Sequence, residues 1–202
     1  LENLAVDLID KAKVKASFKG FHNYPCSLCV SLNEEVVHGI PGPRILKSGD
    51  IVGLDIGILY QGFHTDTAIT CAVGEISEEA EKLLKWTQKA LFEGIKYCRA
   101  GNFLGDIQFA VQKTLEGAGL GVVRDLVGHG VGRELQEAPA IPNFGKPGTG
   151  PKLKEGMTLA IEPMATLGDY YVRILDDGWT VVTIDKSLSA HFEHTVVITQ
   201  TD

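Results

Sequence analysis

Two β-rich apolar runs joined by a tight turn, each interrupted by an aspartate, constrain this chain more than any other feature. The runs cover residues 50–59 and 63–73, and the turn between them contains a glycine. This pattern predicts a β-hairpin. Asp55 interrupts the first run and Asp66 the second. Because carboxylates are excluded from buried strands unless they are paired or bind metal, the two aspartates mark a candidate site.

The predicted hairpin would bring the two aspartates together. If Tyr60 and Gln61 form a two-residue loop, Asp55 lies directly opposite Asp66. Opposed residues on one face of a hairpin have Cβ atoms about 4.5–5.5 Å apart. Two like charges at that separation repel each other, but they are suited to bridging two cations about 3.5–4 Å apart.

Three further polar residues extend this pattern. Glu162 ends an apolar run, Glu193 precedes the β-rich run 195–198, and His129 is flanked by glycines that allow close backbone approach. Taken alone, such residues are more often turn residues, solvent-facing carboxylates or hydrogen-bonded histidines. Together with the hairpin they favour a metal site, because four carboxylates and a neutral imidazole carry a charge that two divalent ions neutralise. This ligand set suits Mn, Fe, Co or Zn.

Length and charge narrow the class of protein. The chain has 202 residues, 44% of them hydrophobic, which predicts a single domain over residues 1–202. It opens at Leu1 and not at methionine, so we expect an N-terminal extension to be missing. A net charge of −7 without a basic stripe argues against nucleic acid as a partner. No apolar run is long enough to cross a membrane, and four scattered cysteines fit the reducing cytoplasm.

The order of predicted elements indicates an α+β fold without a dividing linker. Apolar spacing predicts the end of a helix within residues 1–18 and two further helices, the first capped by Ser77. Residues 33–43 and 139–156, which are rich in glycine and proline, are predicted to be loops. The remaining predicted helices and strands cover residues 77–97 and 104–118, and residues 29–32, 157–162, 171–175, 179–184 and 191–199.

Seven short motifs identify a resemblance that covers nearly the whole chain. They are VHGIP (37–41), LDIG (54–57), GFHTDT (62–67), GHGVGR (128–133), IEPM (161–164), DGWTV (177–181) and SLSAHFEHT (187–195). In these motifs the chain resembles type I methionine aminopeptidases, which are pita-bread metallopeptidases. The resemblance implies a curved antiparallel sheet in two pseudo-symmetric halves, with helices on its outer face and metals at its concave centre.

The resemblance also implies a role for each residue of the site. Asp66 and Glu193 would bridge two divalent metals, Asp55 would hold one of them, and His129 with Glu162 would hold the other. A water or hydroxide between the metals would attack the scissile carbonyl, with Glu162 as proton shuttle. The substrate amine would lie near Asp55. The remaining implied residues are His38, which hydrogen-bonds the scissile amide, and a methionine pocket of Phe21, Tyr24, Cys29, Leu135 and Trp179.

The implied substrates are the N-termini of nascent proteins and peptides with a small second residue, and the ribosome is a further candidate partner. The family is mostly monomeric, so we expect a monomer. The chain departs from the family pattern after the glycine and arginine at 132–133. Gln136 replaces a second active-site histidine, Leu135 replaces a pocket aromatic, and Phe21 stands where tyrosine is frequent. Loss of one oxyanion donor costs about 10²–10³ in rate, and a glutamine that still donates an N–H should cost less.

Weaker signals leave alternatives open. Cys26 and Cys29 form a C-x-x-C, but without a second pair the interpretation as a structural zinc site is not favoured. His191 is predicted to be exposed. One rival function is that of a related peptidase that cleaves before proline, although such relatives carry a large extra domain. The other rival is a binding module without activity, although such relatives tend to lose the ligands that are retained here.

Overall fold

The computed structural model describes residues 1–200, which form three α-helices, one short 3-10 helix (Phe21–Asn23) and fourteen strands. The α-helices are α1 (Glu2–Ala12), α2 (Glu78–Ile95) and α3 (Leu104–Gly117). The strands are β1 (Lys15–Ala16), β2 (Cys29–Leu32), β3 (Glu35–Val37), β4 (Ile51–Tyr60), β5 (Phe63–Ala72), β6 (Gly121–Val122), β7 (Val127–Gly130), β8 (Glu137–Pro142), β9 (Thr158–Ile161), β10 (Met164–Thr166), β11 (Val172–Ile174), β12 (Val181–Thr183), β13 (Ser189–His191) and β14 (Glu193–Val197). No helix within residues 1–200 has the length and apolar character needed to cross a membrane.

A large antiparallel sheet organises the molecule. Its strands follow the order β1-β4-β5-β14-β9-β7-β8, and β2 pairs with β4 on the same edge as β1, nearer the start of β4. The central pair β5 and β14 therefore joins the early hairpin to the last strand of the chain. Two small sheets, β13-β10-β6 and β11-β12-β3, complete the strand pairing. This arrangement confirms the predicted α+β class.

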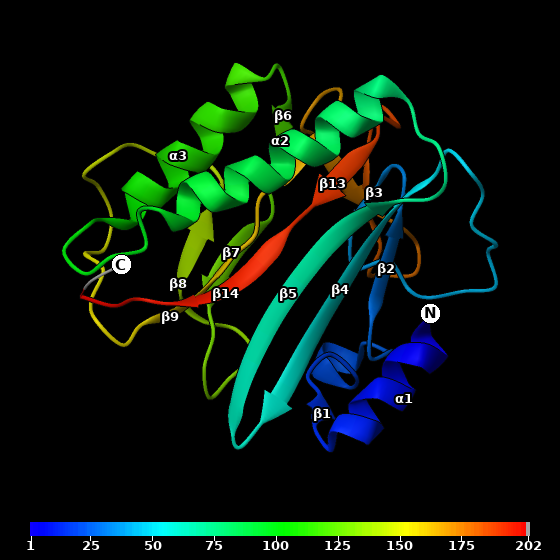
Figure 1. Cartoon of the computed structure of the whole chain (residues 1–202), viewed down its shortest axis with the longest axis horizontal. Helices are drawn as coiled ribbons and strands as arrows, with labels where there is room; N and C mark the ends of the chain where they lie inside the picture. The colour runs from blue at the N-terminus through cyan, green and yellow to red at the C-terminus, as the bar shows by residue number, and fades with distance from the viewer. Residues whose placement is uncertain (201–202) are drawn as a thin grey trace.

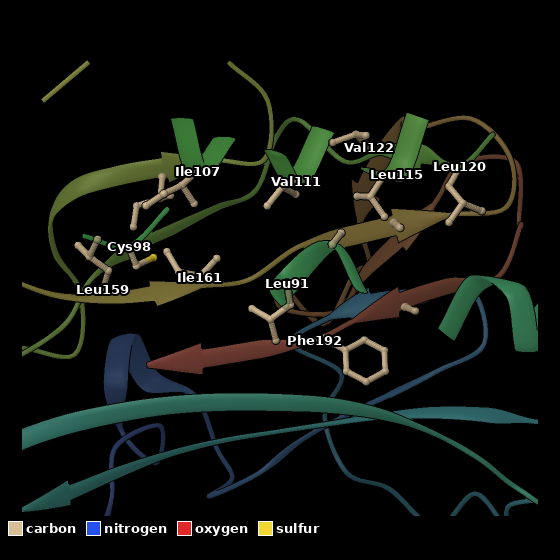
Figure 2. Close-up of a cluster of buried hydrophobic side chains, with 14 of the residues drawn as sticks. Leu91, Cys98, Ile107, Val111, Leu115, Leu120, Val122, Leu159, Ile161 and Phe192 are labelled. Atoms are coloured by element: carbon tan, nitrogen blue, oxygen red, sulfur yellow. The ribbon is translucent and has the colours of Figure 1, made fainter. Parts of the chain in front are cut away.

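Two long helices cover one face of this sheet (Figure 1). The Ser77 hydroxyl accepts a hydrogen bond from the Ala80 backbone N–H at 3.2 Å, so the predicted cap of α2 is confirmed. Gly94 of α2 lets α3 approach closely, because a Cβ there would lie 2.9 Å from Val111 Cγ2. Between helices and strands lies the main core, drawn in part in Figure 2, where Leu91 and Val111 of the helices face Ile161 and Phe192 of the strand side.

The long hairpin of β4 and β5 exists, but its predicted register is wrong by two residues. Asp55 lies opposite Ala68, and Asp66 lies opposite Gly57. The two turn residues are Gln61 and Gly62, with φ of 50° and 82°. Positive φ at both positions is typical of a type I′ turn, and glycine meets that requirement at the second position without steric cost. Because the shift is even, Asp55 and Asp66 still point to the same face.

Two predicted loops contain strands. Residues 33–43 include β3, whose Val36 and Val37 are buried against β12 and its neighbours. Residues 139–156 begin within β8, which pairs with β7. Proline at positions 139 and 142 suggested a loop, but β8 ends the strand order of its sheet. An edge strand tolerates proline because one side of it needs no N–H donor.

Candidate metal centre and substrate pocket

The hairpin and β14 place one row of side chains across the concave face of the sheet. Cys29 pairs with Asp55, Asp55 with Ala68, and Ala68 with Glu193. Side chains opposite each other in a sheet share a face. The methyl group of Ala68 therefore separates two carboxylates and leaves space between them.

Asp66 joins this row from the same strand as Ala68, two residues earlier. Its partner across the hairpin is Gly57, and the Phe18 ring occupies the space that a Cβ there would need. The Asp66 backbone is fixed from β14: its N–H donates to Thr195 Oγ1 at 2.8 Å, and that hydroxyl donates to the Asp66 carbonyl at 2.8 Å. The register of three strands thus holds three carboxylates on one face.

His129 reaches the site from β7. Its Nδ1 lies 2.9 Å from the Gly130 carbonyl oxygen, which can only accept, so Nδ1 carries the proton. The lone pair is therefore on Nε2, which lies 3.9 Å from Asp66 Oδ2 and 3.6 Å from Glu162 Oε1. A neutral imidazole held in this tautomer is the form that ligates metals. Glu162 directly follows β9, the strand next to β7.

The glycines on either side of His129 pack closely against the two neighbouring strands. A Cβ on Gly128 would lie 2.4 Å from the Ala160 carbonyl oxygen of β9, and a Cβ on Gly130 would lie 2.4 Å from the Ala138 carbonyl oxygen of β8. The glycines therefore let β7 fit between its two neighbouring strands. A Cβ on Gly128 would also lie 3.2 Å from Glu162 Cγ, so the close packing extends to a side chain of the carboxylate cluster.

Ligand atoms of Asp66, His129 and Glu193 all lie within 4.8 Å of one another, a geometry that could hold a metal ion. Oδ1 of Asp55 and Oε1 of Glu193 are buried and have no hydrogen-bond partner. Within residues 1–200, the only groups within ion-pair distance of this carboxylate cluster are histidine imidazoles. A cation would accept these unpaired buried oxygens as ligands and would compensate their negative charge. The residues therefore fit a divalent metal.

The electrostatics agree with this interpretation. Burial raises the pKa of Asp55, Glu162 and Glu193 well above the ordinary range, and the charge of Asp66 raises each of them further. Burial raises the pKa of Asp66 to about 7. Burial lowers the pKa of His129, which keeps its imidazole neutral. Each carboxylate therefore lacks the positive partner that its charged form requires.

A cavity of about 300 Å³ opens over the cluster, and every residue predicted for the site lines it. Tyr24 and Trp179 meet edge to face, with ring centroids 5.0 Å apart. The Tyr24 hydroxyl donates within the protein, to the carbonyls of Leu28 and Gly39, so the ring presents an apolar surface. The predicted residues on the cavity wall are Phe21, Tyr24, Cys29, His38, Asp55, Asp66, His129, Leu135, Gln136, Glu162, Trp179 and Glu193.

His38 and Gln136, the two other polar residues predicted for the site, lie on the cavity wall outside the carboxylate cluster. His38 follows β3 in a left-handed backbone conformation, with φ of 60°, and burial lowers its pKa. Its ring meets Trp179 with centroids 6.3 Å apart. Gln136 is exposed on the wall of the cavity, just before β8. Cys26 and Cys29 are both free thiols, and only Cys29 is among the residues lining this cavity.

The sequence interpretation missed one histidine of this region. His191 was predicted to be exposed, but it is buried, and its Nε2 lies 3.5 Å from Glu162 Oε2 and 4.0 Å from Glu193 Oε2. The prediction is wrong because it assigns residues 191–199 to one strand. The chain instead changes sheets at Phe192, so β13 and β14 are separate. Phe18 and Met164 also line the cavity and were not predicted.

Comparisons with known proteins agree with the motifs. A family model described as metallopeptidase family M24 matches residues 2–200. The methionine aminopeptidase of Clostridium perfringens is 53% identical over 198 residues, which make up 98% of this chain and 80% of that protein. Methionine aminopeptidase 1 of Bacillus subtilis is 49% identical over 201 residues, 100% of this chain and 81% of that protein.

Solved structures agree as well. The crystal structure of methionine aminopeptidase from Thermotoga maritima superposes with a TM-score of 0.98 at 50% identity, covering 99% of this chain and 81% of that one. This match confirms the predicted pita-bread fold. Prolidase from Pyrococcus horikoshii superposes with a TM-score of 0.68 at 22% identity, covering 86% of this chain and 45% of that one. The second likeness is one of fold alone.

Proposed function

Because this chain belongs to metallopeptidase family M24 and, within it, to the methionine aminopeptidases, we propose that it removes the initiator methionine from nascent proteins and peptides with a small second residue. One observation carries the proposal. A single cavity holds both the carboxylate cluster and a group of aromatic and sulfur-containing side chains. The first can support peptide hydrolysis, and the second suits the side chain of methionine.

The methionine side chain is proposed to lie among Phe21, Tyr24, Cys29 and Trp179. The edge-to-face contact of Tyr24 with Trp179 supports this assignment, because the arrangement exposes ring surface to the cavity. Thioethers make favourable contacts with aromatic rings. Leu135 is also buried on this wall and closes it with an aliphatic surface.

Two divalent metals are proposed to bind the cluster, with Asp66 and Glu193 shared between them. Asp55 would hold one metal, and His129 with Glu162 the other. The unpaired buried oxygens of Asp55 and Glu193 support this proposal. When bound, the metals supply Lewis-acid polarisation of the scissile carbonyl and a lowered pKa for the attacking water.

The chain's own groups move the proton and hold the substrate. Glu162, whose pKa burial raises, is suited to accept a proton from the attacking water and deliver it to the leaving amine. His38 is proposed to hydrogen-bond the scissile amide, and its buried position favours the neutral ring. The Gln136 carboxamide is proposed to donate to the carbonyl oxygen as negative charge develops there. The Asp55 carboxylate is proposed to accept a hydrogen bond from the free amine of the substrate. Because only the first residue of a chain has a free amine, this contact restricts cleavage to chain ends.

We propose that the protein acts in the cytoplasm as a monomer. The substrate class supports the location, because initiator methionine is present on newly made chains. The protein would encounter such chains at the ribosome. Sedimentation of the purified protein would test the oligomeric state.

The deciding experiment is release of free methionine from Met-Ala-Ser and Met-Lys-Ser by metal-stripped protein supplied with Mn, Fe, Co or Zn. We expect metal-dependent cleavage of the Met-Ala peptide only. Glu193→Gln is the matched control, because it removes a proposed ligand with little change in shape and should abolish cleavage. Two bound metals without cleavage of either peptide would contradict the proposal and favour a binding role. Cleavage of an Ala-Pro peptide in their place would favour the prolidase-like rival.

A further inference from the structure

His191 is a buried histidine with no role in the mechanism above. Its exposed fraction is 4%, and its Nε2 has no hydrogen-bond partner. Strand pairing with Met164 of β10 fixes its backbone. Thr70 of β5 adds a second restraint, because its hydroxyl accepts from the His191 N–H at 2.9 Å and donates to the His191 carbonyl at 2.8 Å. The ring is therefore held beside the carboxylate cluster by two neighbouring strands.

The carboxylate of Glu162 lies between two imidazoles. His129 Nε2 is 3.6 Å from Oε1, and His191 Nε2 is 3.5 Å from Oε2. The two histidines differ in what they can offer. His129 donates through Nδ1 to Gly130 and presents a lone pair to the cluster. The Nε2 of His191 faces oxygens of Glu162 and Glu193, which only accept when these groups are ionised as metal ligands, so a proton on that nitrogen then gives the favourable contact.

We propose that His191 is a positioning residue of the metal site, whose Nε2–H donates to Glu162 Oε2 and holds Oε1 on the side of His129. A small closure of the 3.5 Å separation brings the pair to hydrogen-bond distance. A buried donor left without an acceptor is costly, which favours that closure. Hydrogen bonds to ligating carboxylates orient them, and their loss typically lowers metal affinity by about 10–100-fold. The inference rests on the proposed function, since it assumes that Glu162 is a ligand.

A matched pair of substitutions tests the donor. His191→Gln keeps an N–H at the end of a flexible side chain, whereas His191→Met has a similar length and no donor. Titration of chelator-treated protein with Mn²⁺, followed calorimetrically, gives the affinity and number of sites. We expect His191→Met to lose about 10–100-fold in affinity at one of the two sites and His191→Gln to stay within a few-fold of the unchanged protein. His194→Met is the control, because His194 is exposed and its ring faces Phe92.

The possible outcomes separate this inference from the proposed function. If His191→Met binds Mn²⁺ as tightly as the unchanged protein, or if Gln and Met lose affinity equally, the donor role is overturned while the proposed function stands. If the unchanged protein binds no Mn²⁺, both fail. Melting of each variant in chelator shows that it is folded, and His191→Ala repeats the comparison should the Met variant not fold.

Discussion

At the scale of single residues, this protein buries four carboxylates at a site where burial destabilises their charged forms unless a counter-charge is present. Asp55, Asp66 and Glu193 are each less than 10% exposed, and Glu162 is nearly as enclosed. Burial of an unpaired charge is among the largest penalties a fold can carry. The site is therefore a local loss of stability that the bound ions are expected to offset.

The free-energy cost of ionising buried Asp66 gives a prediction about the stability of the metal-free protein. Its pKa of about 7 lies above the ordinary value of 3.8, so its contribution to stability is complete below about pH 4 and is lost as pH rises through 7. Asp66→Asn cannot ionise. In chelator at pH 8 we expect its free energy of unfolding to exceed that of the unchanged protein by on the order of a few kcal/mol, with little difference near pH 4. Urea unfolding at both pH values measures this, and equal stability at pH 8 would contradict it.

Gln136 gives a prediction about rate. A carboxamide donates an N–H but cannot carry a proton, so restoring histidine should strengthen stabilisation of the developing oxyanion. We expect Gln136→His to raise kcat for Met-Ala-Ser by about tenfold and to change its pH profile. Gln136→Ala should lower kcat. A kcat that is unchanged or lower in the Gln136→His variant would show that glutamine at this position does not slow the reaction.

At the scale of elements, the position of each ligand depends on how closely its strand fits against its neighbours. β7 is the clearest case, since it lies between β9 and β8 and carries His129. Its glycines contact carbonyl oxygens on both sides, and backbone atoms cannot move aside as a flexible side chain could. The hairpin shows the same dependence, because Gly57 leaves room for the Phe18 ring.

Gly130→Ala tests this dependence. The added methyl group would meet the Ala138 carbonyl oxygen, so β7 must shift and His129 with it. We expect a loss of about 1–3 kcal/mol in the free energy of unfolding and weaker Mn²⁺ binding. Gly117→Ala is the control, because no atom lies within 4 Å of a Cβ at that helical position. Urea unfolding of both variants gives the comparison, and equal stabilities would show that β7 has room to spare.

At the scale of the whole molecule, the site joins parts of the chain that are distant in sequence. Asp55 and Asp66 come from the hairpin, whereas His129, Glu162 and Glu193 come from the second half of the chain. Pairing of β5 with β14 brings the two sets together in one sheet (Figure 1). A metal held there by the proposed ligands would contact both halves, so its binding energy would contribute to the stability of the entire fold.

This arrangement predicts one cooperative thermal transition that shifts as a whole with metal. At a free Mn²⁺ concentration one hundred times Kd, a single site adds about 2.7 kcal/mol to the free energy of unfolding. For a chain of this length, we expect Tm to rise by roughly 5–10 °C. Scanning calorimetry with chelator and with Mn²⁺ measures the shift. Two transitions, of which only one responds to metal, would show that the halves unfold independently.

Much of this protein could be predicted from the order of its residues. The long helices, the Ser77 cap and the existence of the hairpin follow from local patterns, because periodicity and capping depend on neighbours within a few residues. The candidate ligands could be found as well, since charged residues inside apolar runs are visible without any coordinates. The α+β class and the family followed from these elements and from short motifs.

The tertiary structure decided which atoms meet. It set the register that places Ala68, and not Asp66, opposite Asp55, because the positive φ of Gln61 and Gly62 fixed the turn. In the tertiary structure β8 is an edge strand although it contains two prolines. His191 points toward the carboxylate cluster and is not exposed. A sequence states which side chains carry charge, but strand pairing over a hundred residues apart determines which of them share a cavity. Such pairing depends on the packing of the whole chain and leaves no local signal.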